Sequence, residues 1–168
     1  MVNDKKKGSF FTPDRLSRFI SGRMLSRRSL KGFVDILEPS VGHGAILRAI
    51  NESPRAKSLQ IRIDAIDNET SFVEYCRGID FEYLDIQLKV CDFVDFDLNV
   101  KKYDAVIGNP PYVGYKILTK EQQKKCKKYF EICDVEGKYF KNLWTYFVLK
   151  SINCLKEKSY CRIWCLNI

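Results

Sequence analysis

Apolar positions along the chain fall into short continuous runs, separated by stretches in which they recur every three or four residues. The runs have the length and composition of buried β-strands and lie at residues 33–37, 59–66, 88–91, 103–107 and 160–166. Between the runs the spacing of apolar residues is helical. This alternation predicts an α/β fold with a mainly parallel sheet and helices on both faces.

The first helix of this pattern is expected to begin at Thr12, with Pro13 in its first turn. Leu16, Phe19 and Ile20 would then share one face, at the spacing of a helix that packs on a sheet. In an open parallel sheet, ligands bind at the carboxyl ends of the strands. The residues that directly follow each predicted strand are therefore the candidates for function.

A glycine turn follows the first predicted strand, in the segment Glu38-Pro39-Ser40-Val41-Gly42-His43-Gly44. Strand, glycine turn and helix open a nucleotide-binding βαβ unit, because glycines let the backbone approach a ligand closely. The third glycine of a dinucleotide site is absent, and Glu38 stands before the turn where a phosphate site would have a Lys after it. The turn therefore favours a ligand with positive charge over pyrophosphate.

Acidic residues follow the next two predicted strands. Asp67 lies 23 residues beyond Gly44, an offset that suits a carboxylate bound to ribose hydroxyls. The alternative is a solvated turn in which Thr70 caps the next helix. Asp92 and Phe93 follow the third strand, where an acid can accept a hydrogen bond from an adenine amino group and an aromatic ring can cover the base.

The segment Asn109-Pro110-Pro111-Tyr112 follows the fourth predicted strand. Its prolines fix two φ angles and bias Asn109 away from the helical region, so the turn is stiff. The Asn109 side chain and the Pro110 carbonyl can accept hydrogen bonds from a planar amino group, and Tyr112 can stack on a flat substrate. These groups suit methylation of an exocyclic amine, whose delocalised lone pair makes it a poor nucleophile. The alternative is an ordinary Asn-Pro turn without a function.

In this order the motifs resemble the N6-adenine DNA methyltransferases of restriction-modification systems, in the gamma arrangement. There, a Thr-Pro element and the cofactor motifs precede the catalytic motif. The resemblance covers nearly the whole chain and rests on Phe10-Phe11-Thr12-Pro13, Glu38 to Gly44, Asp67, Asp92-Phe93 and Asn109 to Tyr112. It implies a Rossmann-like S-adenosylmethionine-dependent methyltransferase fold and a reaction without a metal ion.

The resemblance also implies a site for the cofactor S-adenosyl-L-methionine. The cofactor-binding residues would be Thr12, Glu38, Pro39, Ser40, Gly42, Gly44, Asp67, Asp92 and Phe93. Thr12 would contact the methionine carboxylate, and Glu38 with the glycine turn would shape the methionine and sulfonium side. Asp67 would bind the ribose hydroxyls, while Asp92 and Phe93 would hold the adenine.

The catalytic residues that the resemblance implies are Asn109, Pro110, Pro111, Tyr112 and Phe147. Asn109 and the Pro110 carbonyl would accept hydrogen bonds from the target amino group, and Tyr112 would stack on a base flipped out of the duplex. Phe147 matches a second aromatic residue that the family often carries on a later helix. The alternative for Phe147 is core packing, since it shares an apolar helical face with Trp144 and Val148.

The chain ends at Ile168 on the fifth predicted strand, whereas complete enzymes of this family add two strands and a target-recognition domain. We therefore expect residues 1–168 to form one incomplete catalytic domain, truncated after about the fifth strand and lacking target recognition. A missing C-terminal segment or a separate specificity subunit would complete the enzyme. Double-stranded DNA with a flipped-out target adenine is the expected substrate.

Charge is unevenly distributed along the chain, whose net charge is +8. The basic N-terminal segment 1–31 holds nine basic and two acidic residues, whereas residues 61–104 hold eleven acidic and five basic ones. A second basic run follows the catalytic motif and comprises Lys116, Lys120, Lys124, Lys125, Lys127 and Lys128. Basic excess favours a polyanionic partner, although a lysine run can also be a solvated helix face.

The seven cysteines are scattered without a C-x-x-C pair, and His43 is the sole histidine. No usual zinc set can be formed, and the composition predicts reduced thiols in a cytoplasmic chain. His43 is expected to pack or to be exposed to solvent. No apolar stretch approaches 18 residues, so a membrane is not an expected partner.

Two other classes of function stay open from the sequence. The Asn-Pro-Pro-Tyr tetrapeptide also occurs in protein-glutamine methyltransferases and in some RNA guanine methyltransferases, which methylate equally poor nucleophiles. Alternatively, the chain is a non-catalytic remnant that binds DNA or a partner through its basic faces. The Thr12-Pro13 element and the basic flanks favour DNA methylation within a restriction-modification system.

Overall fold

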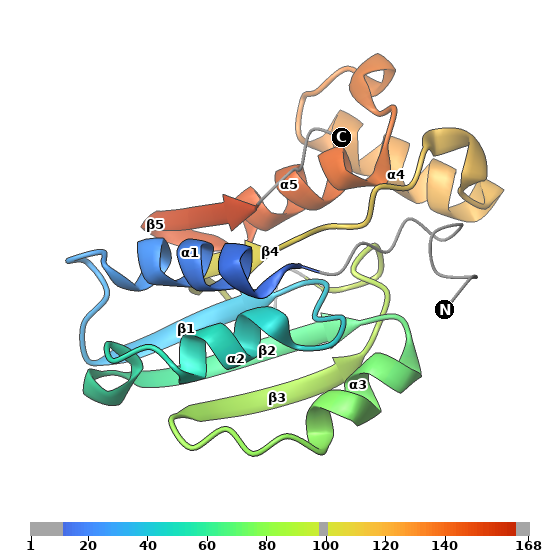
Figure 1. Ribbon diagram of the computed structural model, residues 1–168. Helices are drawn as coiled ribbons and strands as arrows, with labels where there is room; N and C mark the ends of the chain where they lie inside the picture. The colour runs from blue at the N-terminus through green and yellow to red at the C-terminus, as the bar shows by residue number, and fades with distance from the viewer. Residues whose placement is uncertain (1–11, 98–100, 164–168) are drawn as a thin grey trace.

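A parallel sheet forms the centre of the computed structural model, which describes residues 12–97 and 101–163 (Figure 1). Its strands are β1 (Phe33–Glu38), β2 (Gln60–Asp67), β3 (Leu84–Val90), β4 (Tyr103–Gly108) and β5 (Leu155–Ile163). They lie in the order β3-β2-β1-β4-β5, and all neighbours are parallel. The predicted α/β fold is confirmed. The strand order reverses between β1 and β4, so a ligand site is expected beyond the carboxyl ends of these two strands.

Helices cover both faces of the sheet, as the sequence predicted (Figure 1). The helices are α1 (Asp14–Leu25), α2 (Ala45–Asn51), α3 (Thr70–Arg77), α4 (Lys120–Ile132) and α5 (Leu143–Asn153), with short 3₁₀ helices η2 (Ala56–Ser58), η3 (Tyr115–Ile117) and η4 (Gly137–Tyr139). The first three helices pack on one face and the last two on the other. The described residues between β3 and β4 contain no helix, so this connection is a loop.

The sheet separates two hydrophobic cores, because neighbouring side chains along a strand point to opposite faces. In β1, Ile36 packs with Leu47 in the core under α1 and α2, whereas Leu37 packs with Phe147 in the core under α4 and α5. Burial of one such aliphatic side chain stabilises the fold by about 1.5–3 kcal/mol. The two cores therefore fix the register that brings the strand ends together.

The second face of the sheet becomes polar toward the amino ends of the strands. The Nζ atom of Lys101 lies 2.7 Å from Asp35 Oδ1 in β1 and 3.2 Å from Asp64 Oδ2 in β2. The Tyr103 hydroxyl donates to Asp64 Oδ2 at 2.8 Å. Burial alone would raise the pKa of Asp64, but hydrogen bonds from Tyr103 and Lys89 outweigh it, and the pKa lies below its ordinary value. This network links β1, β2 and the start of β4.

Two strand predictions were wrong at their amino ends. Strand β3 begins at Leu84 and not at residue 88, because Leu84, Ile86 and Leu88 alternate with polar residues on an edge strand that is covered on one face only. Strand β5 begins at Leu155, before the predicted residue 160, and residues 164–166 of the predicted strand lie outside the described residues.

The predicted start and buried face of the first helix also need correction. The N-cap of α1 is Pro13, and no side chain caps the helix, so Thr12 is not its cap. The buried face follows Ser17, Ile20 and Met24, whereas Phe19 is 54% exposed. The small side chains of Ser17 and Ser21 are buried and allow α1 to lie close to the sheet. A search for apolar residues alone does not detect this contact.

Candidate active site

The turn between β1 and α2 requires glycine at two positions. Gly42 and Gly44 have φ angles of +49° and +70°, in the left-handed region that other residues rarely adopt. A Cβ atom on Gly44 would also lie 2.9 Å from the Sγ atom of Cys76 in α3. The turn therefore lies directly against α3.

Asp67, at the end of β2, holds this turn in place. Its Oδ2 accepts a hydrogen bond from the Gly42 N–H at 2.9 Å, and its Oδ1 accepts one from the Glu69 N–H at 3.0 Å. Burial raises the pKa of Asp67 even though these two backbone bonds act to lower it. The alternative of a solvated turn is wrong, because Asp67 is buried and α3 is capped at Glu69, with no side-chain bond from Thr70.

Glu38, at the end of β1, has a buried carboxyl group with one oxygen that accepts no hydrogen bond from a described residue. It is 1% exposed, and its Oε2 has no hydrogen-bond partner among the described residues. Burial, assisted by the nearby charge of Asp67, raises the pKa of Glu38 well above its ordinary value, while Arg48 opposes the shift. Buried polar atoms are normally paired, so this oxygen fits a donor or a cation that the protein does not itself supply.

The ends of β1 and β4 meet at the point where the strand order reverses. A Cβ atom on Gly108 would lie 3.1 Å from Pro39 Cδ, so the two strand ends are in close contact. The Ser40 hydroxyl donates to the carbonyl oxygen of Asn109 at 3.0 Å. Asn109 is 8% exposed and faces two adjoining pockets. The glycine turn and the Asn-Pro-Pro-Tyr segment are thus parts of one site.

One of these pockets, called the Asp67 pocket below, brings together nine of the fourteen residues predicted for the site. It is lined by Pro39, Ser40, Gly42, Asp67, Asn68, Phe72, Cys91, Asp92, Phe93, Asn109, Pro111, Gln122, Leu143 and Phe147. The adjoining pocket is lined by Thr12, Asp14, Glu38, Ser40, Val41, Gly42, His43, Ala45, Ile46, Arg48 and Asn109. The pockets share Ser40, Gly42 and Asn109, so a ligand longer than either one can extend across both.

The loop after β3 forms one wall of the Asp67 pocket. Asp92 accepts hydrogen bonds from the Val94 N–H at 2.9 Å and from Gln122 Nε2 of α4 at 3.0 Å. Phe93 is buried, and its ring centroid lies 4.8 Å from that of Phe147 in α5. Both helices on this face therefore determine where the loop lies.

Lys150 of α5 supports the same loop from beneath. Its buried Nζ donates to the carbonyl oxygens of Phe93 at 2.7 Å and Val94 at 2.9 Å, and it lies 5.2 Å from the centroid of the Phe93 ring. Burial lowers the pKa of Lys150 below its ordinary value. Since Lys150 binds carbonyl groups and forms no ion pair with a described residue, its main interaction is with the backbone of the pocket wall.

Some predicted residues lie behind the pocket surface. Pro110 and Gly44 are buried and Tyr112 is half-buried, and none of the three lines either pocket. Phe147 lines the Asp67 pocket and also packs in the core, so the alternative of core packing describes part of its environment. His43 packs its ring edgewise against Phe72, at a centroid distance of 4.7 Å.

Several lining residues were missed by the sequence predictions. Gln122 carries no motif of its own, and only its capping-box spacing from Thr119 marks it in the sequence. Arg48 and Phe72 lie on the helices that follow the first two strand ends, where a search of the first helical turns would have found them. Asn68 directly follows Asp67 and could have been included with it.

The side chains that line the two pockets include carboxylates, amides and aromatic rings, which are suited to binding a polar organic molecule with flat rings. The described part of the chain contains no group of three or more His, Cys, Asp or Glu residues that could hold a metal ion. Within the same residues, no helix has the length and apolarity needed to cross a membrane.

Comparison with known proteins identifies related sequences. Residues 43–164 match the family described as Eco57I restriction-modification methylase. The chain is 32% identical over 164 residues to the type II methyltransferase M.AccI of Acinetobacter calcoaceticus, an alignment that covers 94% of this chain. The chain spans 27% of the length of that relative.

Solved structures share the fold at low sequence identity. A Listeria monocytogenes protein assigned to the class I S-adenosylmethionine-dependent methyltransferases superposes with a TM-score of 0.68 and 20% identity, over 91% of this chain and 45% of its own. A type I restriction-modification methyltransferase subunit from Streptococcus thermophilus gives 0.66 and 18%, over 94% and 34%. The expected Rossmann-like methyltransferase fold is confirmed.

Proposed function

The chain belongs to the Eco57I restriction-modification methylase family, and we propose that it carries out methyl transfer from S-adenosylmethionine to the N6 amino group of adenine in DNA. The observation that carries this proposal is the pair of adjoining pockets along the ends of β1, β2, β3 and β4. One pocket holds the buried Glu38 oxygen that has no hydrogen-bond partner among the described residues, and Asn109 lines both pockets. The fold supports the same chemistry.

The pocket at Glu38 fits the methionine part of the cofactor. The Glu38 Oε2 atom has no hydrogen-bond partner among the described residues, and the ammonium group of methionine would supply three donors and a positive charge. Thr12 lines the same pocket and would contact the methionine carboxylate. Gly42 lines both pockets and would let the backbone pass close to the ligand, while the positive φ angle of Gly44 shapes the same turn.

The Asp67 pocket fits the nucleoside part of the cofactor. Asp67 already accepts two backbone hydrogen bonds, and each carboxylate oxygen has a further lone pair for a ribose hydroxyl. Phe93 would cover one face of the adenine, and Asp92 would accept from its amino group. When bound, S-adenosylmethionine supplies an electrophilic methyl group on a positively charged sulfur.

The Asn109-Pro110-Pro111-Tyr112 segment would hold the target amine. The Asn109 side-chain oxygen and the Pro110 carbonyl would accept its two hydrogens, which turns the nitrogen lone pair toward the methyl donor. Tyr112 would stack on the flipped base and so offset part of the cost of flipping, which is a few kcal/mol. Phe147, against Phe93 in the pocket wall, would limit water access.

DNA is favoured over the other substrates by the family to which the chain belongs. A protein glutamine amide or an RNA guanine amino group poses the same chemical problem, so pocket geometry does not separate these substrates. The chain spans only about a quarter of the length of M.AccI. We therefore assign recognition of the DNA sequence to a further segment or to a separate specificity subunit.

A labelled methyl-transfer assay tests the proposal. The chain is incubated with S-adenosylmethionine that carries a labelled methyl group and with duplex DNA, single-stranded DNA, RNA or protein, and the acceptor is hydrolysed to identify the product. Label in N6-methyladenine from DNA, lost in Asn109→Ala, is the expected result. Label in glutamine or guanine would replace the proposal with one of its alternatives. Failure of a folded chain even to bind S-adenosylmethionine would favour the non-catalytic remnant.

A further inference from the structure

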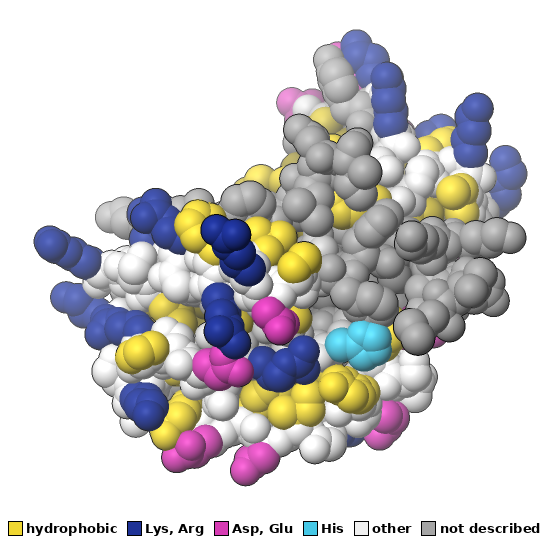
Figure 2. Space-filling model, viewed as in Figure 1, with side chains coloured by type: hydrophobic (Ala, Val, Ile, Leu, Met, Phe, Trp, Pro, Cys, Tyr) yellow, Lys and Arg dark blue, Asp and Glu magenta, His cyan; other side chains and the backbone are white. Residues whose placement is uncertain are grey.

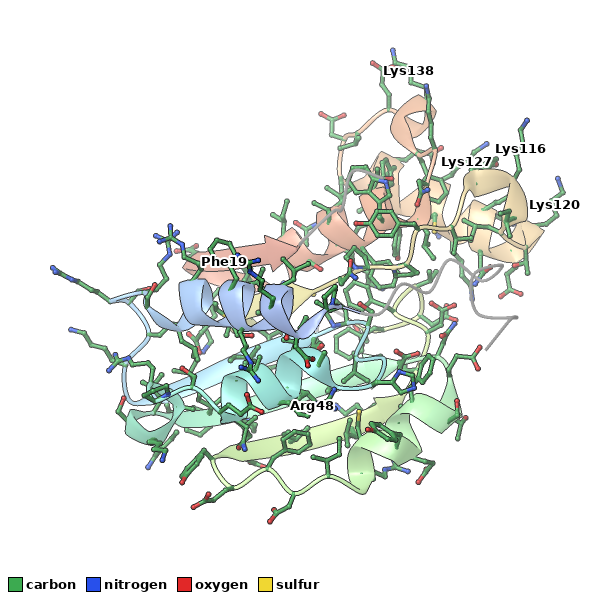
Figure 3. The ribbon with its side chains drawn as sticks, in the orientation of Figure 1. Phe19, Arg48, Lys116, Lys120, Lys127 and Lys138 are labelled. Atoms are coloured by element: carbon green, nitrogen blue, oxygen red, sulfur yellow. The ribbon has the colours of Figure 1, made fainter. Side chains whose placement is uncertain are left out.

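Four lysines form a stripe along the exposed side of α4. Lys120, Lys124, Lys127 and Lys128 recur at helical spacing, so they share one face, and all four are exposed. Lys120 and Lys127 extend outward from this part of the molecule in Figure 3. Because a helix rises about 1.5 Å per residue, the stripe is about 12 Å long. These four residues are called the lysine stripe below.

The charge of the lysine stripe is largely not neutralised by the protein. Lys120, Lys124 and Lys128 make no ion pair with a described residue. By contrast, Lys125, on another side of the same helix, lies 2.7 Å from Asp95 Oδ1 and 2.8 Å from Glu121 Oε1. Lys125 is therefore neutralised by acidic side chains of the protein, whereas the charges of the lysine stripe are available to a ligand.

The surroundings of the stripe do not cancel its positive charge. Residues 113–142 contain eight Lys and four acidic residues, so the four Lys outside the stripe balance the four acids and the charge of the stripe remains. Figure 2 shows Lys and Arg side chains projecting from the upper right of the molecule, where Figure 1 places α4. Lys116 and Lys138 extend from the same region in Figure 3. The net positive charge of this region attracts anionic partners.

Helix α4 is held firmly by the residues around it. Thr119 and Gln122 form a capping box at its start, and the buried Phe130 packs against Phe140 at a centroid distance of 5.3 Å. Lys127 Nζ lies 5.2 Å from the centroid of the Tyr115 ring. Since α4 buries its own apolar side in the protein, the stripe is not the polar side of a helix that inserts into a membrane surface.

The stripe lies close to the proposed site of methyl transfer. Gln122, on another side of the same helix, lines the Asp67 pocket next to Asp92. The stripe and the pocket wall are therefore separated by about one helix diameter, about 10–12 Å. The chain reaches Lys120 only eight residues after Tyr112. A polyanion bound along the stripe would thus lie beside the mouth of the pocket.

We propose that the lysine stripe binds the phosphate backbone of the duplex that presents the target adenine. This inference rests on the proposed function for the identity of the polyanion as DNA. Unpaired lysines at regular intervals on a rigid helix suit contacts with successive phosphates, which position a nucleic acid without reading its sequence. The stripe positions the strand, and the pocket receives the base.

The test uses the complete 168-residue chain and a fluorescently labelled DNA duplex, with affinity measured by anisotropy between 50 and 200 mM salt. The variant Lys120→Gln/Lys124→Gln/Lys128→Gln should bind more weakly. The slope of log affinity against log salt should be shallower by about 0.9 for each lost phosphate contact. The matched control Arg28→Gln/Lys31→Gln/Lys57→Gln removes three charges near the amino ends of β1 and β2, and it should keep most of the affinity.

Three outcomes would overturn the inference: no binding of duplex by the unmodified chain at 50 mM salt, an unchanged slope in the stripe variant, or an equal loss in the control. Tighter binding of an acidic peptide of matched charge would also overturn it.

Binding of S-adenosylmethionine, measured in parallel, separates the two proposals. If the cofactor binds and DNA is methylated while the stripe variant binds DNA with unchanged affinity and salt dependence, the inference about the stripe is wrong and the proposed function stands. If DNA binds through the stripe but no cofactor binds, the proposed function fails instead.

Discussion

The carboxylate of Asp67 accepts a hydrogen bond from the backbone N–H of Gly42 at 2.9 Å, and this bond ties the end of β2 to the turn after β1. A bond between a charged acceptor and a buried donor contributes about 1.5–3 kcal/mol. Asp67 also lines the Asp67 pocket. Folding and the proposed ribose site therefore depend on one side chain, which connects the stability of the turn to the occupancy of the pocket.

Gly44→Ala is expected to destabilise the chain by about 1–2 kcal/mol, because an alanine at φ +70° is strained. Its Cβ would also meet the Cys76 Sγ atom at 2.9 Å. Denaturant unfolding measures the change. Gly114→Ala is the matched control, since that glycine has φ −64° and no atom within 4 Å of an added Cβ. Equal effects of the two substitutions would show that the turn has no special backbone requirement.

Glu38→Gln is expected to stabilise the ligand-free protein at neutral pH and to weaken cofactor binding. The pKa of Glu38 is raised in the folded chain, so the folded state holds its proton more tightly than the unfolded state does. The stability contributed by the protonated group is complete below the unfolded pKa and is lost as pH rises through the folded pKa. Replacement by Gln removes that loss.

The pH dependence of cofactor binding provides the companion test for Glu38. An ammonium group pairs with the ionised carboxylate, so the affinity of the unmodified chain for S-adenosylmethionine should fall as pH decreases through the raised pKa of Glu38. Calorimetric titration at a series of pH values measures this. Affinity in Glu38→Gln should be low and should lack this pH dependence. An unmodified chain whose affinity stayed constant with pH would rule out Glu38 as the ammonium partner.

Lys150→Met is expected to lower stability by about 1–3 kcal/mol, because it leaves the Phe93 carbonyl oxygen without its 2.7 Å donor. The loop that carries Asp92 should also become less ordered, so cofactor affinity should fall together with stability. Chemical denaturation and calorimetry measure the two effects. Ile152→Met, at an exposed position on the same helix, is the control and should be close to neutral. A stable Lys150→Met variant with normal affinity would mean that Lys150 does not support the pocket wall.

Asp64→Asn is expected to reduce stability at neutral pH and to have a smaller effect in acid. The pKa of Asp64 is lowered in the folded chain, so its contribution is present above the unfolded value of about 3.9 and is lost as pH falls through the folded pKa. Unfolding curves of both proteins between pH 7 and pH 3 should therefore converge. Curves that stay parallel over this range would indicate that the charge of Asp64 contributes nothing to stability.

Residues at strand ends were predictable because an apolar run marks each strand and the chemistry follows it directly. Glu38, Asp67 and Asn109 were found in this way, and the structure brings all three together at the carboxyl ends of the strands. Gln122 and Lys150 were not found, because their contacts with the loop after β3 span 30 and 57 residues of sequence. Local spacing holds no information about such contacts, which depend on how α4 and α5 pack.

The proposed cofactor site is tested most directly by thermal or chemical unfolding of the 168-residue chain with and without S-adenosylmethionine. At a ligand concentration a hundred times the dissociation constant, stability should rise by about 2.7 kcal/mol. The increase should be lost in Asp67→Ala and kept in Glu52→Ala, which removes an exposed carboxylate elsewhere. A folded chain whose stability is unchanged by S-adenosylmethionine, at any concentration up to millimolar, would contradict the assignment of the pocket.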